Sequence, residues 1–61
     1  MFMEIVTRRK EIVCININQI VYVTPDKSST VIVDSMGQDY YVNEPYDSVV
    51  ARIKAIVNQN S

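Results

Sequence analysis

Histidine and tryptophan are absent from this sequence of 61 residues, and it contains a single cysteine, Cys14. These absences exclude a Cys/His metal centre, a disulfide bond within the chain, and a catalytic dyad or triad that depends on histidine. The acidic residues do not have the spacing of a calcium-binding loop, and turn or helix-cap roles account for them. We therefore expect that the protein is not an enzyme and that it needs no metal and no cofactor.

Excess charge of one sign and long apolar runs are also lacking. Six Lys and Arg residues against seven Asp and Glu residues give a formal net charge of −1 at pH 7, so general nucleic-acid binding is unexpected. The apolar runs at residues 20–23 and 31–33 are far shorter than the roughly 20 residues of a membrane span. Residues 1–4 lack the basic segment of a signal peptide. The lone cysteine in an apolar segment suits a reducing compartment, which indicates the cytoplasm.

Length and composition indicate a single small domain that spans residues 1–61. Hydrophobic residues make up 48% of the chain and charged residues 21%, as in globular proteins. A chain of this size buries only about 60% of the surface that its unfolded form exposes. Association with a second chain often supplements so small a core.

Five short segments rich in β-branched and aromatic residues predict β-strands, at residues 2–7, 11–17, 20–24, 30–34 and 39–43. The basic residues 8–10 separate the first two segments, which predicts a hairpin with these residues at its tip. Asparagines predict a bend near residue 17, and Pro25 followed by Asp26 predicts a loop. The only glycine, Gly37, falls in the turn before the last strand, where a positive φ is needed.

The hydrophobic period changes to that of an amphipathic helix from Tyr46 onwards. The apolar positions form one stripe, which consists of Tyr46, Val49, Val50, Ile53, Ile56 and Val57. Arg52 lies on the opposite face and is expected to point to solvent. Asn43 or Glu44 can cap the helix, and Pro45 suits its first turn. The predicted fold is therefore α+β: a small antiparallel sheet of four to five strands, arranged as a meander, followed by one C-terminal amphipathic helix.

Several predicted strands carry large apolar side chains on both faces, whereas one helix can cover only one face of a sheet. Residues 2–6, 20–23 and 31–33 show this pattern. Two arrangements remain open: the second face packs against another copy of the chain, or the strands curl into a half-barrel that covers itself. We expect the first arrangement, a homodimer formed through apolar residues of the sheet.

Five residues are candidates for binding a partner, and these are Arg8, Arg9, Lys10, Tyr22 and Tyr40. The basic residues can contact phosphates or an acidic protein, or they can form a solvated tip that stops the strand end from pairing with a neighbour. The tyrosines can form a stacking surface, or they can be half-buried residues of the sheet. Cys14 is expected to be a small residue of the core.

Five stretches of the chain carry a family resemblance, and these are residues 5–8, 15–20, 24–26, 30–33 and 41–44, the last followed by Val49 and Ile53. Together they resemble the small FlbD/SwrD flagellar proteins, in which a V-T-R start precedes an N-x-x-x-I bend, a T-P-D element, a final strand and a short helix. Arg9 and Lys10 stand where that family has Asn-Gly, and Gln38 stands where it has lysine. The resemblance implies a non-enzymatic accessory protein that acts by contact with another protein.

Two weaker resemblances imply an alternative, a small nucleic-acid-binding regulator that uses Arg8, Arg9 and Lys10. Residues 20–42 resemble the core of LytTR DNA-binding domains, and the chain length with Thr7-Arg8-Arg9 resembles the carbon-storage regulators, which bind mRNA as dimers. Size and acidity also suit a phage- or plasmid-encoded inhibitor of a host protein. We expect a bacterial or phage protein-interaction or regulatory module, with a protein partner that the sequence does not identify.

Overall fold

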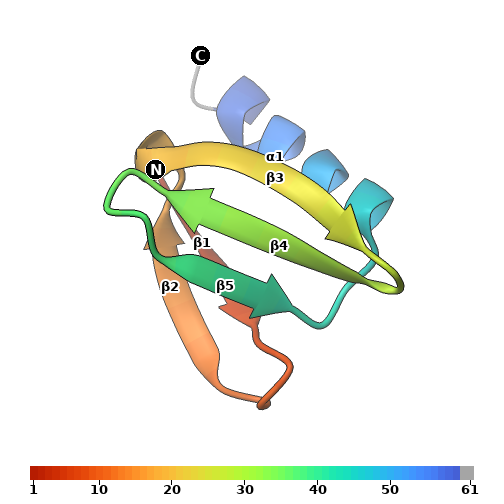
Figure 1. Cartoon of the computed structure of the whole chain (residues 1–61). Helices are drawn as coiled ribbons and strands as arrows, with labels where there is room; N and C mark the ends of the chain where they lie inside the picture. The colour runs from red at the N-terminus through yellow and green to blue at the C-terminus, as the bar shows by residue number, and fades with distance from the viewer. Residues whose placement is uncertain (60–61) are drawn as a thin grey trace.

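Five strands and one helix follow one another in the computed structural model, which describes residues 1–59 (Figure 1). The elements are β1 (Phe2–Val6), β2 (Ile12–Asn16), β3 (Ile20–Asp26), β4 (Ser29–Asp34), β5 (Asp39–Val42) and α1 (Tyr46–Gln59), with a 3₁₀ turn, η1 (Ile17–Gln19), between β2 and β3. The α+β fold predicted from the hydrophobic pattern is confirmed, and the strand ends differ from the predicted ones by at most two residues. Pro25 and Asp26, which the sequence predicts to be in a loop, are the last two residues of β3.

The strands form two antiparallel sheets, β1-β2 and β3-β4-β5, in place of one continuous meander. The chain turns between them because Asn16 caps η1: its side-chain oxygen accepts a hydrogen bond from the backbone N–H of Asn18 at 3.0 Å. An isolated bridge between Thr7 and Val42 joins the end of β1 to β5. The strands are therefore curled, as in the half-barrel that the sequence left open.

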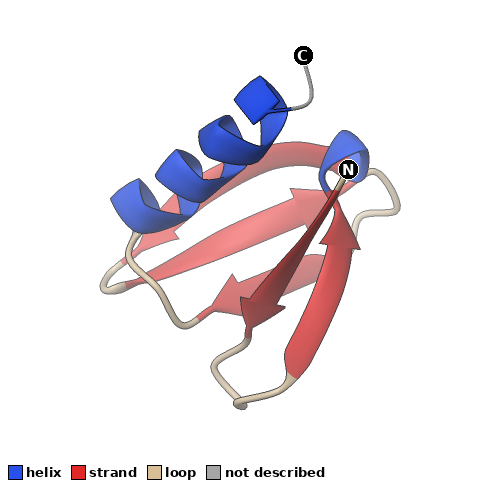
Figure 2. Ribbon diagram, turned by 180° about the vertical axis from the view of Figure 1, so that it is seen from behind, coloured by secondary structure: helices blue, strands red, loops and turns tan. Residues whose placement is uncertain are grey.

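The core lies between the two sheets and the helix. The β1-β2 hairpin and α1 lie side by side over one face of the three-stranded sheet, as the views from front and back agree (Figure 2). Alternation along the strands turns one set of apolar side chains inward. Among the described residues, the buried apolar ones are Met3, Ile5, Ile15, Ile17, Ile32, Val42 and Val49.

The middle of the apolar stripe of α1 faces this core, whereas Tyr46 and Val57 at the ends of the predicted stripe are exposed. Val49 is fully buried, and Ile53 and Ile56 pack against the buried residues. The expectation that Arg52 points to solvent is wrong, because its guanidinium donates hydrogen bonds to the Glu44 carboxylate and to the backbone of β1. The helical period separates the apolar from the polar face of a helix, but it does not show which other segments lie beside the polar face. Here the β1-β2 hairpin lies beside the face that carries Arg52.

The expectation that Cys14 belongs to the core is also wrong, since its side chain is exposed. Along β2, Ile15 is buried and Cys14 lies on the opposite face, where it pairs with Glu4 of β1. The same outer face carries Phe2 and Ile12, which are 64% and 72% exposed. The curled sheets therefore leave apolar side chains on the outside of the hairpin.

Three turns among the described residues have a left-handed backbone, and one of them is the β3-β4 turn, where Lys27 has a φ of 57°. Gly37 has a φ of 80°, as its position in the sequence predicts, and Lys10 has a φ of 65° at the hairpin tip. Within residues 1–59, no helix is long and apolar enough to cross a membrane.

Candidate functional site

The basic residues 8–10 form the tip of the β1-β2 hairpin. Two backbone hydrogen bonds close the tip, from Thr7 N–H to the Glu11 carbonyl at 2.9 Å and from Lys10 N–H to the Thr7 carbonyl at 2.8 Å. The Thr7 hydroxyl also accepts a hydrogen bond from Glu11 N–H at 3.2 Å. Both ends of the tip are therefore tied to Thr7.

Backbone hydrogen bonds also hold the tip against β5. Arg8 N–H donates to the Tyr41 carbonyl at 2.9 Å, and Asn43 N–H donates to the Val6 carbonyl at 2.9 Å. These bonds flank the bridge between the two sheets. The pairing ends at Arg8, because the hairpin turns there while β5 extends further back towards Asp39.

The Arg8 side chain lies over β5 and reaches β3. Its guanidinium carbon is 5.1 Å from the centre of the Tyr41 ring, and its Nη1 is 3.5 Å from Oδ2 of Asp26. The side chains of Arg8 and Asp26 are 53% and 41% exposed. At such exposure each contact contributes about 0.5–1 kcal/mol or less, so the contacts orient Arg8 more than they stabilise the fold.

An open groove lies between the hairpin and β5. It is lined on the hairpin side by Thr7, Arg8, Arg9, Glu11 and Val13, and on the other side by Asp26 and residues 38–41. Val13 and Tyr40 pack against the core as well, so they give the groove an apolar part. The carboxylates of Glu11, Asp26 and Asp39 offset the two arginines, so the groove carries no excess of positive charge.

Part of the β5 backbone edge faces this groove. The Tyr41 carbonyl accepts a hydrogen bond from Arg8 N–H, so the backbone groups of Tyr41 face away from β4. Because the direction of these groups alternates along an antiparallel strand, those of Asp39 face away from β4 as well. Arg8 engages only the Tyr41 carbonyl. The N–H of Tyr41 and both backbone groups of Asp39 therefore lie at an open strand edge.

The structure brings four of the five predicted residues to the groove and places the fifth elsewhere. Arg8, Arg9 and Tyr40 line the groove, and Lys10 lies beside it at the tip. Tyr22 lies apart on β3, where it is 55% exposed, so it forms no common surface with Tyr40. Tyr41 is not among the five predicted residues, because only the pairing of β5 with the distant hairpin brings its ring under Arg8.

Tyr40 is held by Asp34, a residue that also shapes the turn before β5. Tyr40 donates its hydroxyl hydrogen to Asp34 Oδ2 at 3.3 Å, and Asp34 Oδ1 accepts from the N–H groups of Met36 and Gln38 at 3.0 and 2.9 Å. Burial raises the pKa of Tyr40 above its usual 10.0, and the charge of Asp34 and its hydrogen bond raise it further. Tyr40 is thus a neutral, oriented wall of the groove.

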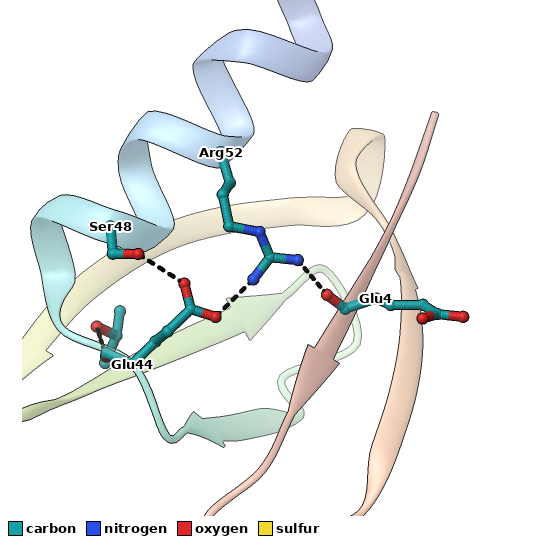
Figure 3. Close-up of polar contacts among 5 residues, drawn as sticks. Glu4, Glu44, Ser48 and Arg52 are labelled. Atoms are coloured by element: carbon teal, nitrogen blue, oxygen red, sulfur yellow. Dashed lines mark hydrogen bonds and ion pairs between the residues drawn. The ribbon is translucent and has the colours of Figure 1, made fainter.

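A second polar cluster, the Glu44 clasp, consists of Glu44, Ser48, Arg52 and the backbone carbonyl of Glu4 (Figure 3). The Glu44 carboxylate accepts from the Ser48 hydroxyl at 2.8 Å and from Arg52 Nη1 at 2.6 Å. Arg52 Nη2 donates to the Glu4 carbonyl, while the Glu4 carboxylate points away from it. The buried Thr30 hydroxyl donates to the Glu44 carbonyl at 2.8 Å. The clasp therefore ties α1 to β1 and β4, which is a structural role.

Within the described part of the chain, no three cysteine, aspartate or glutamate side chains are grouped so that they could hold a metal ion. The surfaces that can carry a functional argument are the groove and the outer side of the hairpin. No protein-family model, curated protein or solved structure matches the chain.

Proposed function

We propose that the protein is a non-enzymatic interaction module of the cytoplasm, which forms a homodimer and regulates or assists a partner protein through the groove. The observation that carries the proposal is the open edge of β5 inside the groove, where Asp39 and Tyr41 present backbone groups to solvent. The resemblance to flagellar accessory proteins implies the same mode of action, by protein contact.

The ligand that suits this edge is an extended segment of another protein. Such a segment can add to β5 as a further strand, because its backbone supplies the hydrogen bonds that Asp39 and Tyr41 lack. Its alternate side chains then contact the apolar part of the groove formed by Val13 and Tyr40. Arg9, which is exposed at the rim, favours an acidic residue in the bound segment.

Charge argues against the nucleic-acid alternative. Arg8 already faces Asp26 and stacks on Tyr41, and the groove carries three carboxylates beside its two arginines. Affinity for a phosphate backbone depends on the number of phosphates that a protein neutralises, and here that number is small.

Selection from a library of random dodecapeptides tests the proposal. We expect selected peptides to bind with micromolar affinity and to perturb the amide resonances of Asp39 and Tyr41. Arg9→Glu should weaken binding of an acidic selected peptide by about tenfold, because an attraction becomes a repulsion. The matched control is Lys54→Glu, the same change of charge at an exposed position of α1.

Two results would contradict the proposal. One is a set of peptides whose perturbed amides lie away from the groove and whose affinity ignores Arg9→Glu. The other is a gel shift with mixed RNA or duplex DNA at about 150 mM salt that is tight and salt-sensitive, and that disappears when residues 8–10 are replaced; this outcome would favour the regulator alternative.

A further inference from the structure

One edge of the two-sheet arrangement, the outer edge of β2, is open. β2 pairs with β1 on one side, and within residues 1–59 it pairs with no strand on the other side. In the view from behind, β2 lies at the border of the molecule, with β1 between it and α1 (Figure 2). The open edge of β2 is thus on the side of the hairpin away from the helix.

The hydrogen bonds of the hairpin show which backbone groups face this edge. Ile17 N–H donates to the Met1 carbonyl, and Thr7 N–H donates to the Glu11 carbonyl. Hydrogen bonds alternate along the strand, so the odd-numbered residues of this segment bond to β1. The backbone groups of Ile12 and Cys14 and the N–H of Asn16 consequently point outward, whereas the carbonyl of Asn16 begins η1.

The edge strand β3 has features that prevent pairing with another chain, whereas β2 has none. β3, the edge strand of the second sheet, contains a bulge at Val21, a proline at Pro25 and a charge at Asp26. Bulges, prolines and charges are the devices by which natural edge strands avoid pairing with another chain. The sequence of β2, IVCIN, has no charge and no proline, and its pairing with β1 is regular.

We propose that β2 pairs with β2 of a second copy about a two-fold axis, which joins the two hairpins into one four-stranded antiparallel sheet. This inference rests on the proposed homodimer and names its surface. Cys14 is the middle residue of β2, so a register with Cys14 on the axis pairs Ile12 with Asn16 of the second copy. In this register, each residue of β2 whose backbone groups point outward lies opposite such a residue of the second copy. An edge that is complementary to itself in this way suits a second copy of the same chain.

Charge and area agree with this pairing. The nearest charge on the same face is Glu4, and two intervening strands would separate the two Glu4 side chains by about 14 Å, given strand spacings of about 4.8 Å. Ile12 is 72% exposed, so pairing covers apolar surface at the edge. The area is small for a specific interface, at or below about 1,200 Å² in total, so we expect a dimer of micromolar affinity.

Sedimentation from about 5 to 500 µM under reducing conditions tests the surface. Cys14→Lys places two like charges opposite each other on the axis, and we expect it to weaken dimerisation by roughly tenfold or more. Val21→Lys is the matched control: it adds the same charge at an exposed apolar position of the protected edge, and its dimerisation should equal that of the wild type. Circular dichroism checks that each variant is folded.

Oxidation with diamide gives a second measurement that needs no destabilising change. Cα atoms of a directly opposed, hydrogen-bonded pair are about 5.5 Å apart, within the range of a disulfide bond, so Cys14 should cross-link the dimer. The double variant Cys14→Ser/Val21→Cys, whose thiol lies on β3, should cross-link at least tenfold more slowly.

The outcomes separate this inference from the proposed function. A wild-type dimer that Cys14→Lys leaves intact, or equal cross-linking from both cysteine positions, would overturn the β2 surface while the homodimer stands. A monomer at every concentration would overturn the homodimer and its surface together. Peptide binding in the groove, measured separately, is unaffected by either result.

Discussion

Replacing Arg52 by methionine measures how strongly the Glu44 clasp holds the helix to the hairpin. Methionine retains an unbranched apolar stem of similar reach, so the change removes the charged head more than the packing of the stem. The variant loses the 2.6 Å hydrogen bond to the Glu44 carboxylate and the bond to the Glu4 carbonyl. The first bond holds α1 to the segment just before it, and the second joins α1 to β1, which lies 48 residues earlier in the sequence.

The expected loss of unfolding free energy follows from these two contacts. Hydrogen bonds to charged groups contribute about 1.5–3 kcal/mol when buried, and exposed ion pairs about 0.2–1 kcal/mol. The side chains of Arg52 and Glu44 are 38% and 27% exposed, so the pair lies between these limits. We expect Arg52→Met to cost about 1–2 kcal/mol, and each kcal/mol lowers the melting temperature by about 4–8 °C in so small a domain.

Urea melts of four further variants complete the experiment. Lys54→Met, at an exposed position of α1, and Glu4→Gln, whose side chain points away from Arg52, should each cost less than about 0.5 kcal/mol. Glu44→Gln alone and combined with Arg52→Met gives a double-mutant cycle, with an expected coupling of about 0.5–1.5 kcal/mol. Equal effects of Arg52→Met and Lys54→Met, or no coupling to Glu44, would refute the clasp.

Three further predictions concern the core, a titrating group and a turn. Ile32→Ala, at a side chain with 0% exposure, should cost about 2–5 kcal/mol in a urea melt, whereas Ile12→Ala, at 72% exposure, should cost under about 0.5 kcal/mol; similar costs would contradict the assignment of faces. The raised pKa of Tyr40 means that its hydroxyl keeps its proton to a higher pH in the folded than in the unfolded state. The contribution of the neutral hydroxyl to stability should therefore be complete below pH 10.0 and be lost as the pH rises through the pKa of Tyr40 in the folded state. Stability measured from pH 9 to 11 should show that decline in the wild type and less of it in Tyr40→Phe, and parallel curves would contradict it. Gly37→Ala should cost about 1–2 kcal/mol through its φ of 80° alone, since no atom lies within 4 Å of the added methyl, and an unchanged thermal melt would contradict this.

Local pattern was enough to predict the elements of the fold. Alternation and β-branched residues mark the strands, and the shift to a helical period at Tyr46 coincides with the first residue of α1. The position of Gly37 predicts the left-handed turn that the backbone adopts there. Each of these signals depends only on residues that are close together in the sequence, so a single sequence is enough to detect it.

Contacts between distant segments could not be predicted in the same way. The division into two sheets depends on the turn that Asn16 makes, and the bridge from Thr7 to Val42 is a tertiary contact. Only this bridge places Tyr41 beside Arg8 and creates the groove. For the same reason Arg52 was assigned to solvent: nothing in the helical period indicates that β1 passes close to that side of α1.

The manner in which the hairpin is attached explains why both proposed surfaces lie on it. β1 is bound on its inner side to β5 by two backbone hydrogen bonds, and to α1 through Arg52. β2 has no such attachment among the described residues; its strand partner is β1, and η1 leads directly from its end into the second sheet. Because β2 is paired only with β1, its other edge faces solvent. Because the hairpin tip diverges from β5 beyond Arg8, part of the β5 edge is left uncovered. The open edge of β2 and the groove are therefore two consequences of one arrangement: among the described residues, hydrogen bonds join the hairpin to β5 and α1 on its β1 side only, while β2 contributes Ile15 to the core.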